Sequence, residues 1–387
     1  MSATSHALLS PSSSHRWINC TPSARLEEHV EDKGSEYAEQ GTCAHALCEC
    51  KLRHLLGTED MESINEFKSL RDKWYDTEME NCTSDYVEIV WNKYQEALKT
   101  DPRAQLLVEQ KLNFSSWIPD SFGTADAEIV TEDVMEVVDF KYGKGVEVSA
   151  VRNTQMMIYA LGALGDFDLD YDIKEVRMTI VQPRIHNVSE WSISTDELKQ
   201  WADTTLRAAA LMAYEGKGEQ KAGEWCKFCK VKARCAVLAN EAIAAYTQHT
   251  EKTLISDDDM PSVLALIPAI KSWCTAVEDY ATAQAILGHK WVGYKLVEGR
   301  SIRKITDPDG LSAKLEFAGY HDIYKPAELK SLGDLERQIG KKTFADLSAG
   351  YVDKPAGKPT LVTDDDKRPE INVNTAVEDF KDVQINS

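Results

Sequence analysis

Three runs of sequence decide the fold: GTAD at residues 123–126, VVDFK at 137–141 and QMMIY at 155–159. The second run alternates like a strand. Side chains two apart on a strand share a face, so we expect Asp139 and Lys141 to point the same way. The TED turn at 131–133 predicts a hairpin between the first two runs. Such a hairpin would bring Asp126 beside Asp139.

The first run is expected to be a strand as well. Strict alternation would separate its side chains into two faces, Thr124, Asp126 and Glu128 against Ala125, Ala127 and Ile129. Two carboxylates as close as Asp126 and Asp139 repel each other unless a cation lies between them. Mg²⁺ and Mn²⁺ prefer oxygen ligands and leave room for a water and a phosphate. Lys141 would then orient the attacking water or stabilise the developing negative charge. The alternative is an ordinary amphipathic hairpin with solvated acids and a surface lysine.

Other segments add polar side chains to this group. Gln155 and Tyr159 are four residues apart and therefore share one face of a predicted helix. Glu109 lies on a further predicted strand, and His45 lies in a helix-like stretch from about 35 to 56. Each residue also has an ordinary interpretation, Tyr159 as core, Gln155 as surface, and His45 as a packed or surface histidine.

In this order the residues resemble the PD-(D/E)XK nuclease superfamily, and specifically its RecB-like branch. That branch carries a Gly-x-x-x-His helix, a Glu-bearing strand, Gly-x-x-Asp, Asp-x-Lys and Gln-x-x-x-Tyr, and all five occur here between Gly41 and Tyr159. The resemblance implies an α/β fold with a mixed central sheet flanked by helices. It also implies site residues: metal ligands His45, Asp126, Asp139 and the backbone carbonyl of Phe140, the catalytic lysine Lys141, the acid Glu109, and the substrate-positioning pair Gln155 and Tyr159.

Nine cysteines form a second pattern. Three of them, Cys226, Cys229 and Cys235, form a Cys-x₂-Cys-x₅-Cys run, and thiolates spaced this closely predict a metal or cluster site. The run lacks a local fourth ligand, for which Cys20 is the best distant candidate. The alternatives to Cys20 lie on the predicted His45 helix and are expected to be core residues: Cys43, Cys48 and Cys50.

One cysteine before the nuclease motifs and three after them resemble the iron–sulfur nucleases, such as the AddB-type helicase–nuclease subunit and CRISPR-associated RecB-like nucleases. The resemblance implies a [4Fe–4S] cluster that ties the two ends of the nuclease domain together. Structural zinc and unligated buried cysteines stay open as alternatives. The polar, serine-rich start does not look like a signal peptide, and no apolar run approaches the length needed to span a membrane. We therefore expect a cytoplasmic protein without disulfides, which would be in the bacterial host cytoplasm if a phage encodes it.

The charge balance limits how the chain could bind nucleic acid. Its 387 residues carry a formal net charge of −20, which argues against a general nucleic-acid coat protein. Basic residues instead occur locally, in the stretch 221–234 and in a group formed by Lys295, Arg300, Arg303 and Lys304. Either group could contact phosphates or form a solvated face.

Periodicity predicts an α/β domain followed by a mainly helical region. Helices are expected at about 35–56, 84–99 with Ser84 as its cap, 149–164 and 195–215, and strands at about 105–114, 122–131, 134–141, 176–181 and 188–194. The later region is expected to hold a helix at 261–287, a strand or hairpin at 291–305, and helices at 311–318 and 327–339. The expected domains are an arm carrying Cys20 (1–34), the nuclease domain closed by the cysteine-rich segment (35–239), a mainly helical accessory domain (240–350) and a flexible tail (351–387).

The full-length pattern resembles an uncharacterised phage and prophage family of RecB-like proteins, through HALLSPSSSHRW at 6–17, SEYA at 35–38 and GYKLVEGRS at 293–301. The resemblance implies a metal-dependent DNA exonuclease that acts on DNA ends or single strands in phage replication and recombination. It also implies a phage single-strand annealing or binding protein as a partner. A structure-specific or restriction-type endonuclease and a non-catalytic DNA-binding or scaffold subunit are the alternatives. The oligomeric state, including a homo-oligomeric ring, stays open.

Overall fold

The computed structural model describes residues 7–30, 34–167, 170–247 and 256–295, together with residues 297, 310, 317, 340, 343 and 344. The chain divides into two units, Met1–Lys304 and Ile305–Ser387. All elements below belong to the first unit. The predicted helices at 311–318 and 327–339, the tail at 351–387 and most of the strand or hairpin at 291–305 lie outside the described residues, and the predicted domain boundaries stay predictions.

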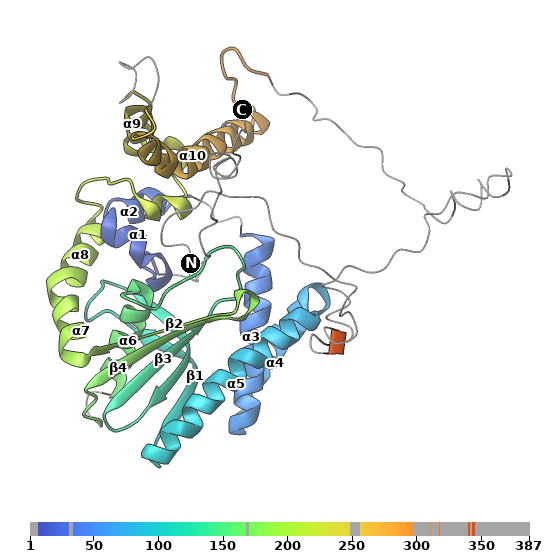
Figure 1. Cartoon of the computed structure of the whole chain (residues 1–387), viewed down its shortest axis with the longest axis vertical. Coiled ribbons are helices and arrows are strands. Elements are labelled where there is room, and N and C mark those ends of the chain that lie inside the picture. Colours follow the sequence, from blue (N-terminus) through green and yellow to red (C-terminus); the bar gives the residue numbers. More distant parts are fainter. Residues whose placement is uncertain are drawn as a thin grey trace, which may run out of the picture. The chain divides into compact units, whose positions relative to one another are not determined.

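A five-stranded mixed sheet forms the centre of the first unit (Figure 1). Its strands follow one another across the sheet in chain order: β1 (Gln105–Asn113), β2 (Phe122–Val130), β3 (Val134–Phe140), β4 (Glu175–Gln182) and β5 (Asn187–Ser194). Neighbouring strands are antiparallel except β3 and β4. That pair is parallel because a helix, α6 (Thr154–Phe167), makes the crossover between them. The α/β fold class and the five predicted strands are confirmed.

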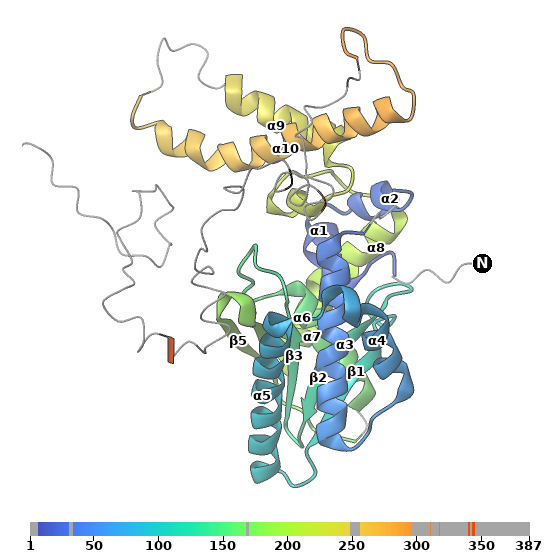
Figure 2. The same cartoon turned by 90° about the vertical axis from the view of Figure 1, so that its right-hand side faces the viewer.

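Helices cover both faces of the sheet (Figures 1 and 2). One face carries α3 (Glu36–Leu56), α4 (Met61–Trp74) and α5 (Thr77–Thr100). The other carries α6, α7 (Thr195–Trp201), a π-helical turn (Ala202–Leu206) and α8 (Arg207–Glu215). The two faces are called here the α3 side and the α6 side.

Each side has its own hydrophobic core, and β3 shows how the sequence divides between them. Met135 and Val137 pack on the α6 side, whereas Val138 and Phe140 pack on the α3 side. This is the period of two expected for a strand that is covered on both faces. Tyr86 of α5 adds a buried hydrogen bond, from its hydroxyl to the Val138 carbonyl oxygen at 3.2 Å.

Capping residues explain where the predicted helix boundaries are right and wrong. Ser35 caps α3 by accepting a hydrogen bond from the Ala38 amide at 3.1 Å, as the predicted start near residue 35 requires. The predicted start of α5 at Ser84 is wrong, because Asp76 caps that helix through the Met79 amide at 2.7 Å. Helix α4, capped by Asp60, was not predicted. The predicted helix at 149–164 begins later, at Thr154.

The amino-terminal arm folds against the end of the α6 side. Its helices α1 (Ser14–Asn19) and α2 (Ser23–Glu27) lie beside α8 in both views (Figures 1 and 2). Arg25 donates from Nε to the Tyr214 carbonyl oxygen at 2.6 Å, and Thr21 donates to the Lys217 carbonyl oxygen at 2.6 Å. The arm is therefore held to a segment far away in sequence, next to the cysteine run.

Two helices follow the cysteine run, α9 (Ala236–Thr247) and α10 (Met260–Ile286). Within the described part of the chain, α10 alone is long and apolar enough to cross a membrane by length and composition, with a mean hydropathy of 1.4. The expectation that no apolar run approaches this length is wrong for α10. A single helix of this kind is weak evidence for a membrane span. Polar contacts join α10 to the cysteine run, with Lys232 Nζ 3.3 Å from the Ser272 hydroxyl.

Candidate active site

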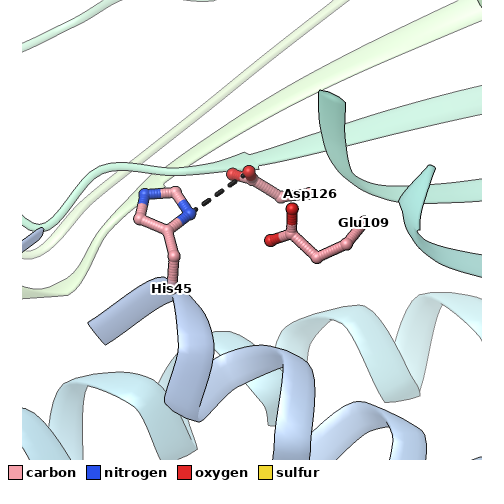
Figure 3. A group of neighbouring side chains, drawn as sticks. All are labelled: His45, Glu109 and Asp126. Atoms are coloured by element: carbon pink, nitrogen blue, oxygen red, sulfur yellow. Dashed lines mark ion pairs between the residues drawn. The ribbon is translucent and has the colours of Figure 1, made fainter. Parts of the chain in front are cut away.

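Side chains from three elements meet at one point: His45 of α3, Glu109 of β1 and Asp126 of β2 (Figure 3). One ligand atom from each lies within 4.8 Å of the others, and His45 Nδ1 is 3.2 Å from Asp126 Oδ1. Among the described residues, this is the one group of three or more His, Cys, Asp or Glu side chains that comes together so closely. We call it the carboxylate–histidine group.

A break in strand alternation creates this meeting. Glu109 has a φ of +50°, in the left-handed region that few non-glycine residues adopt. It lies opposite Asp126, between the regular pairs Val108–Ala127 and Gln110–Ala125. Ala127 packs on the α3 side but Ala125 packs on the α6 side. The expectation that Ala125 and Ala127 share a face is therefore wrong, because the strands rotate at this position and turn both acids toward His45.

A second polar group lies on β3 and α6. Lys141 Nζ is 3.0 Å from Asp139 Oδ2 and donates a hydrogen bond to Gln155 Oε1 at 3.2 Å. Gln155 Nε2 in turn donates to Asp139 Oδ1 at 3.3 Å and to the Tyr159 hydroxyl at 3.2 Å. Asp139 and Lys141 thus face the same side, as strand periodicity predicts, and the first turns of α6 bring Gln155 and Tyr159 to them.

The two groups join through the backbone of Phe140. Asp126 Oδ2 accepts a hydrogen bond from the Phe140 amide at 2.6 Å. The regular β2–β3 pairing ends at Ala127–Val138, so Asp126 and Asp139 are the next residues on each strand. The Phe140 ring packs 5.2 Å from the His45 ring. The predicted role of the Phe140 carbonyl as a metal ligand stays a prediction.

The charges of the joined site are strongly coupled. Burial, with the nearby Asp126 charge, raises the pKa of Glu109 to about 8. Burial raises the pKa of Asp139 to about 6 although Lys141 opposes it. Burial also raises the pKa of Asp126, but His45 and Lys141 outweigh it and hold that pKa below its usual value. Burial lowers the pKa of His45, yet Asp126 and Glu109 bring it to about 9. Three carboxyl groups thus share the positive charges of His45 and Lys141. A bound cation would reduce the repulsion between these carboxyl groups.

Arg184, which sequence reasoning did not identify, supports the segment after Lys141. Its guanidinium lies 4.5 Å from the centre of the Tyr142 ring and donates to Glu78 Oε2 at 2.8 Å. It also reaches Gln40, on the α3 turn before His45, at 3.4 Å. Arg184 follows β4 in a short turn, and no sequence pattern indicates that it contacts α3 and α5.

The four predicted cluster cysteines line one small cavity of about 20 Å³. Cys20 directly follows α1. Cys226 lies in the short 3₁₀ turn Glu224–Phe228 and Cys229 directly follows it. Cys235 directly follows a second 3₁₀ turn, Lys232–Arg234. Burial and the Glu27 carboxylate raise the pKa of Cys229 to about 12, and burial raises the pKa of Cys226. Cys43 and Cys48 are buried in the α3-side core, as predicted, whereas Cys50, also predicted to be core, is only half-buried and lies outside that cluster.

Several contacts hold the arm against the cysteine run. Arg16 forms an ion pair with Glu27 at 2.8 Å and donates to the Phe228 carbonyl oxygen at 3.3 Å. Glu27 also accepts from the Lys230 amide at 2.8 Å. Lys232, in the basic stretch 221–234, is engaged with the Lys227 carbonyl oxygen and with Ser272. Part of this stretch therefore serves internal packing, and its role toward phosphates stays a prediction.

The fold and site together define an α/β protein with a candidate metal centre at a break in its central sheet. The chain belongs to the family described as "Protein of unknown function (DUF2800)", whose model matches residues 6–369. The match extends over the sheet and the region after it, as expected from the full-length resemblance to an uncharacterised family. A solved structure titled "Crystal structure of SSO0001" has 14% sequence identity over 58% of this chain and 96% of that chain, with a TM-score of 0.24. A similarity this distant carries no structural argument.

Proposed function

We propose that this protein is a metal-dependent deoxyribonuclease of the PD-(D/E)XK superfamily, in its RecB-like branch. One observation carries the proposal. The carboxylate–histidine group and the Asp139–Lys141 pair converge around Phe140, with Gln155 and Tyr159 of α6 beside them. Residues spread from α3 to α6 thus meet in the order and arrangement that the motif pattern implies.

The donor set fits a divalent cation. Glu109 and Asp126 offer carboxylate oxygens and His45 offers a ring nitrogen, all within 4.8 Å of one another. Asp139 Oδ2 is buried and, apart from its ion pair with Lys141, receives no hydrogen bond from a described residue. Carboxylates suit Mg²⁺ and Mn²⁺, and the imidazole makes the set more favourable for Mn²⁺. A bound ion would act as a Lewis acid toward the phosphate and lower the pKa of its water.

Lys141, Gln155 and Tyr159 would have separate roles around such an ion. Burial lowers the pKa of Lys141, but Asp139 and Asp126 outweigh it and raise that pKa above its usual value. Lys141 therefore keeps its proton at neutral pH. It could orient an attacking water or stabilise charge on the phosphate. Gln155 forms hydrogen bonds with both Lys141 and Asp139 and so keeps their side chains beside each other. Tyr159, which accepts a hydrogen bond from Gln155, would position the substrate strand. Cleavage is expected to leave a 5′-phosphate.

The cysteine cavity supports a [4Fe–4S] cluster held by Cys20, Cys226, Cys229 and Cys235. Tetrahedral zinc with Zn–S bonds of about 2.3 Å would set the sulfur atoms about 3.8 Å apart. The described cysteines form no group of three thiols within 4.8 Å of one another, so these distances do not favour one ligand over the other. A bound cluster would cross-link the arm to the segment after α8. Zinc and unligated buried cysteines stay the alternatives.

The full proposal is an exonuclease acting on DNA ends or single strands in phage replication and recombination, with an annealing or single-strand-binding protein as its partner. The support is the site geometry together with the full-length resemblance to an uncharacterised phage and prophage family. A structure-specific or restriction-type endonuclease would need the same residues. The presence of Asp126, Asp139 and Lys141 together counts against a non-catalytic DNA-binding or scaffold subunit.

The test is cleavage of end-labelled linear single- and double-stranded DNA with Mg²⁺ or Mn²⁺, comparing wild type with Lys141→Ala. Loss of one preorganised charge donor typically lowers the rate by roughly 10²–10³-fold. Lys144→Ala is the matched control, because Lys144 is an exposed lysine close by that pairs with Glu78. Metal-dependent release of label by wild type and Lys144→Ala, but not by Lys141→Ala, is the expected result.

Circular single-stranded DNA distinguishes the two enzyme classes, because only an endonuclease can cut it. Absence of cleavage under either metal, in protein purified without oxygen, would refute the nuclease and favour the binding subunit. Full activity of Lys141→Ala would refute the assigned site.

A further inference from the structure

Beyond the carboxylate–histidine group, the β1–β2 ribbon continues as a row of cross-strand pairs. Glu109 lies opposite Asp126, Lys111 pairs with Thr124, and Asn113 pairs with Phe122. Side chains two apart share a face, and a strand rises about 3.4 Å per residue. Lys111 is therefore about 7 Å, and Phe122 about 14 Å, along the ribbon from the two acids.

The intervening residues show which way this row faces. Leu112 and Ala125 belong to the α6-side core. Gly123 pairs with Leu112 and faces the same way, since a Cβ on it would lie 3.1 Å from the Phe114 ring and 3.4 Å from Tyr159. Lys111 and Phe122 therefore face the opposite side, the side on which His45 meets Asp126.

The ribbon and the turn after β1 line an open groove of about 750 Å³, with Lys111, Phe122 and Thr124 from this face and Leu112 and Gly123 from the other. Phe122 is 49% exposed within it, and Lys111 forms no ion pair with any residue in the described ranges. Thr124 and the hydroxyl groups of Ser115 and Ser121 are the other polar side chains near them, with Asn113. One acid also lines the groove: Asp120, whose carboxylate accepts a hydrogen bond from the Tyr214 hydroxyl at 2.5 Å.

The geometry points to a track for a single-stranded nucleic acid along this face, in which Phe122 stacks against an unpaired base and Lys111 contacts a phosphate. The inference rests on the proposed nuclease and adds the form of its substrate. Single-strand binders combine cationic groups that follow the backbone with exposed aromatic rings that stack on bases. A duplex keeps its bases stacked on one another, so an exposed aromatic side chain about 14 Å along the ribbon from the acids favours a strand that is already unpaired.

The test is a binding measurement that needs no cleavage. A short 5′-fluorescein-labelled oligothymidylate is titrated with protein in EDTA, and fluorescence anisotropy gives the affinity. Phe122→Leu keeps the apolar volume but loses the stacking surface, and should weaken binding about tenfold. Phe122→Trp keeps a stacking ring and should bind like wild type. Unchanged melting temperatures show that both variants are folded.

The phosphate contact has its own readout in the salt dependence. Lys111→Gln should lower the slope of log affinity against log salt by about 0.7, the value for one phosphate contact on a single strand. Lys68→Gln is the matched control, an exposed lysine on α4 that forms no ion pair with the described residues. Its slope should equal that of wild type.

Equal oligothymidylate affinity of Phe122→Leu and wild type would overturn the track, even if the enzyme cuts DNA. An equal loss of affinity for a blunt-ended duplex would also overturn it, because the duplex has no unpaired base for Phe122. Conversely, weaker binding by Phe122→Leu in a protein that never cuts would support the track and refute the nuclease.

Discussion

Helix α6 passes so close to β1 at Gly162 that this position excludes any side chain. A Cβ there would lie 2.5 Å from Cε1 and 2.8 Å from Cδ1 of Phe114, and 3.1 Å from Cβ of Leu112. Phe114 is fully buried, and its ring packs 6.1 Å from that of Tyr159, so it has little room to move. Overpacking of this kind costs about 1–3 kcal/mol.

Gly165 on the same helix is the matched site, because a Cβ there would meet nothing within 4 Å. Exchange of glycine for alanine stabilises a helix interior by up to about 1 kcal/mol. Both alanine variants gain this stabilisation, so it largely cancels when their free energies of unfolding are compared. The remaining difference is the cost of overpacking at Gly162. We expect Gly162→Ala to have a free energy of unfolding about 1–3 kcal/mol below that of Gly165→Ala.

Urea unfolding followed by circular dichroism measures the difference. Equal stability of the two variants would refute the reasoning, because it would mean that Phe114 yields without cost. Cleavage provides a second readout, since α6 carries Gln155 and Tyr159. A shift of α6 away from β1 should lower the cleavage rate of Gly162→Ala, whereas Gly165→Ala should cleave like wild type.

Two further predictions concern buried groups away from the catalytic pair. Burial and the charge of Asp166 raise the pKa of Glu128 from 4.5 to about 8, so the native state keeps a proton that the unfolded chain releases. The free energy of unfolding should therefore fall between about pH 5 and 8, by up to about 1.4 kcal/mol per pH unit, and urea titrations of Glu128→Gln should show a smaller fall. If the cluster is present, protein purified without oxygen should be brown and contain iron, and Cys226→Ser should lose both the colour and the iron. Cys226→Ser should also melt at a lower temperature, because a structural metal site contributes folding free energy. Cys274→Ser, which removes an exposed thiol on α10, should change neither property, and a colourless wild type with one tightly bound zinc would contradict the cluster.

The fold could be predicted largely because strand and helix periods dominate this sequence. The strands β1 to β5 alternate or form short apolar runs, and their predicted ranges agree with the observed ones to within a residue or two. Helix α4 escaped prediction because most of its residues are polar and only a few apolar side chains, such as Phe67, Leu70 and Trp74, pack on the core. Ser84 is a residue type that often caps helices, which led to the predicted start there. The helix begins one residue after Asp76 instead, because Asp76 caps it and the residues from Thr77 to Thr83 are also helical.

The contact between Asp139 and Lys141 could be anticipated for the same reason. A period of two places Asp139 and Lys141 together, and a spacing of four places Gln155 above Tyr159. The contacts of Arg184 with α3 and α5 could not be anticipated from the sequence, because they depend on how elements that are distant in sequence pack together. The cavity shared by Cys20 and the cysteine run likewise depends on the arm folding back, which no local pattern shows.

The left-handed residue Glu109 links the candidate metal centre to the proposed strand track. Regular alternation from Val108, which packs on the α3 side, would turn Glu109 to the α6 side, away from His45. It would also turn Leu112 toward the α3 side and Lys111 into the α6-side core. The φ of +50° reverses these positions, so that Leu112 is buried while Glu109 and Lys111 face the side of His45. Strain of this kind costs about 1–3 kcal/mol and persists where the surroundings hold it in place. Here one strained residue supplies an acid to the candidate metal centre and turns Lys111 to the same side of the ribbon. The candidate metal site and the proposed strand track would thus both depend on the same break in β1.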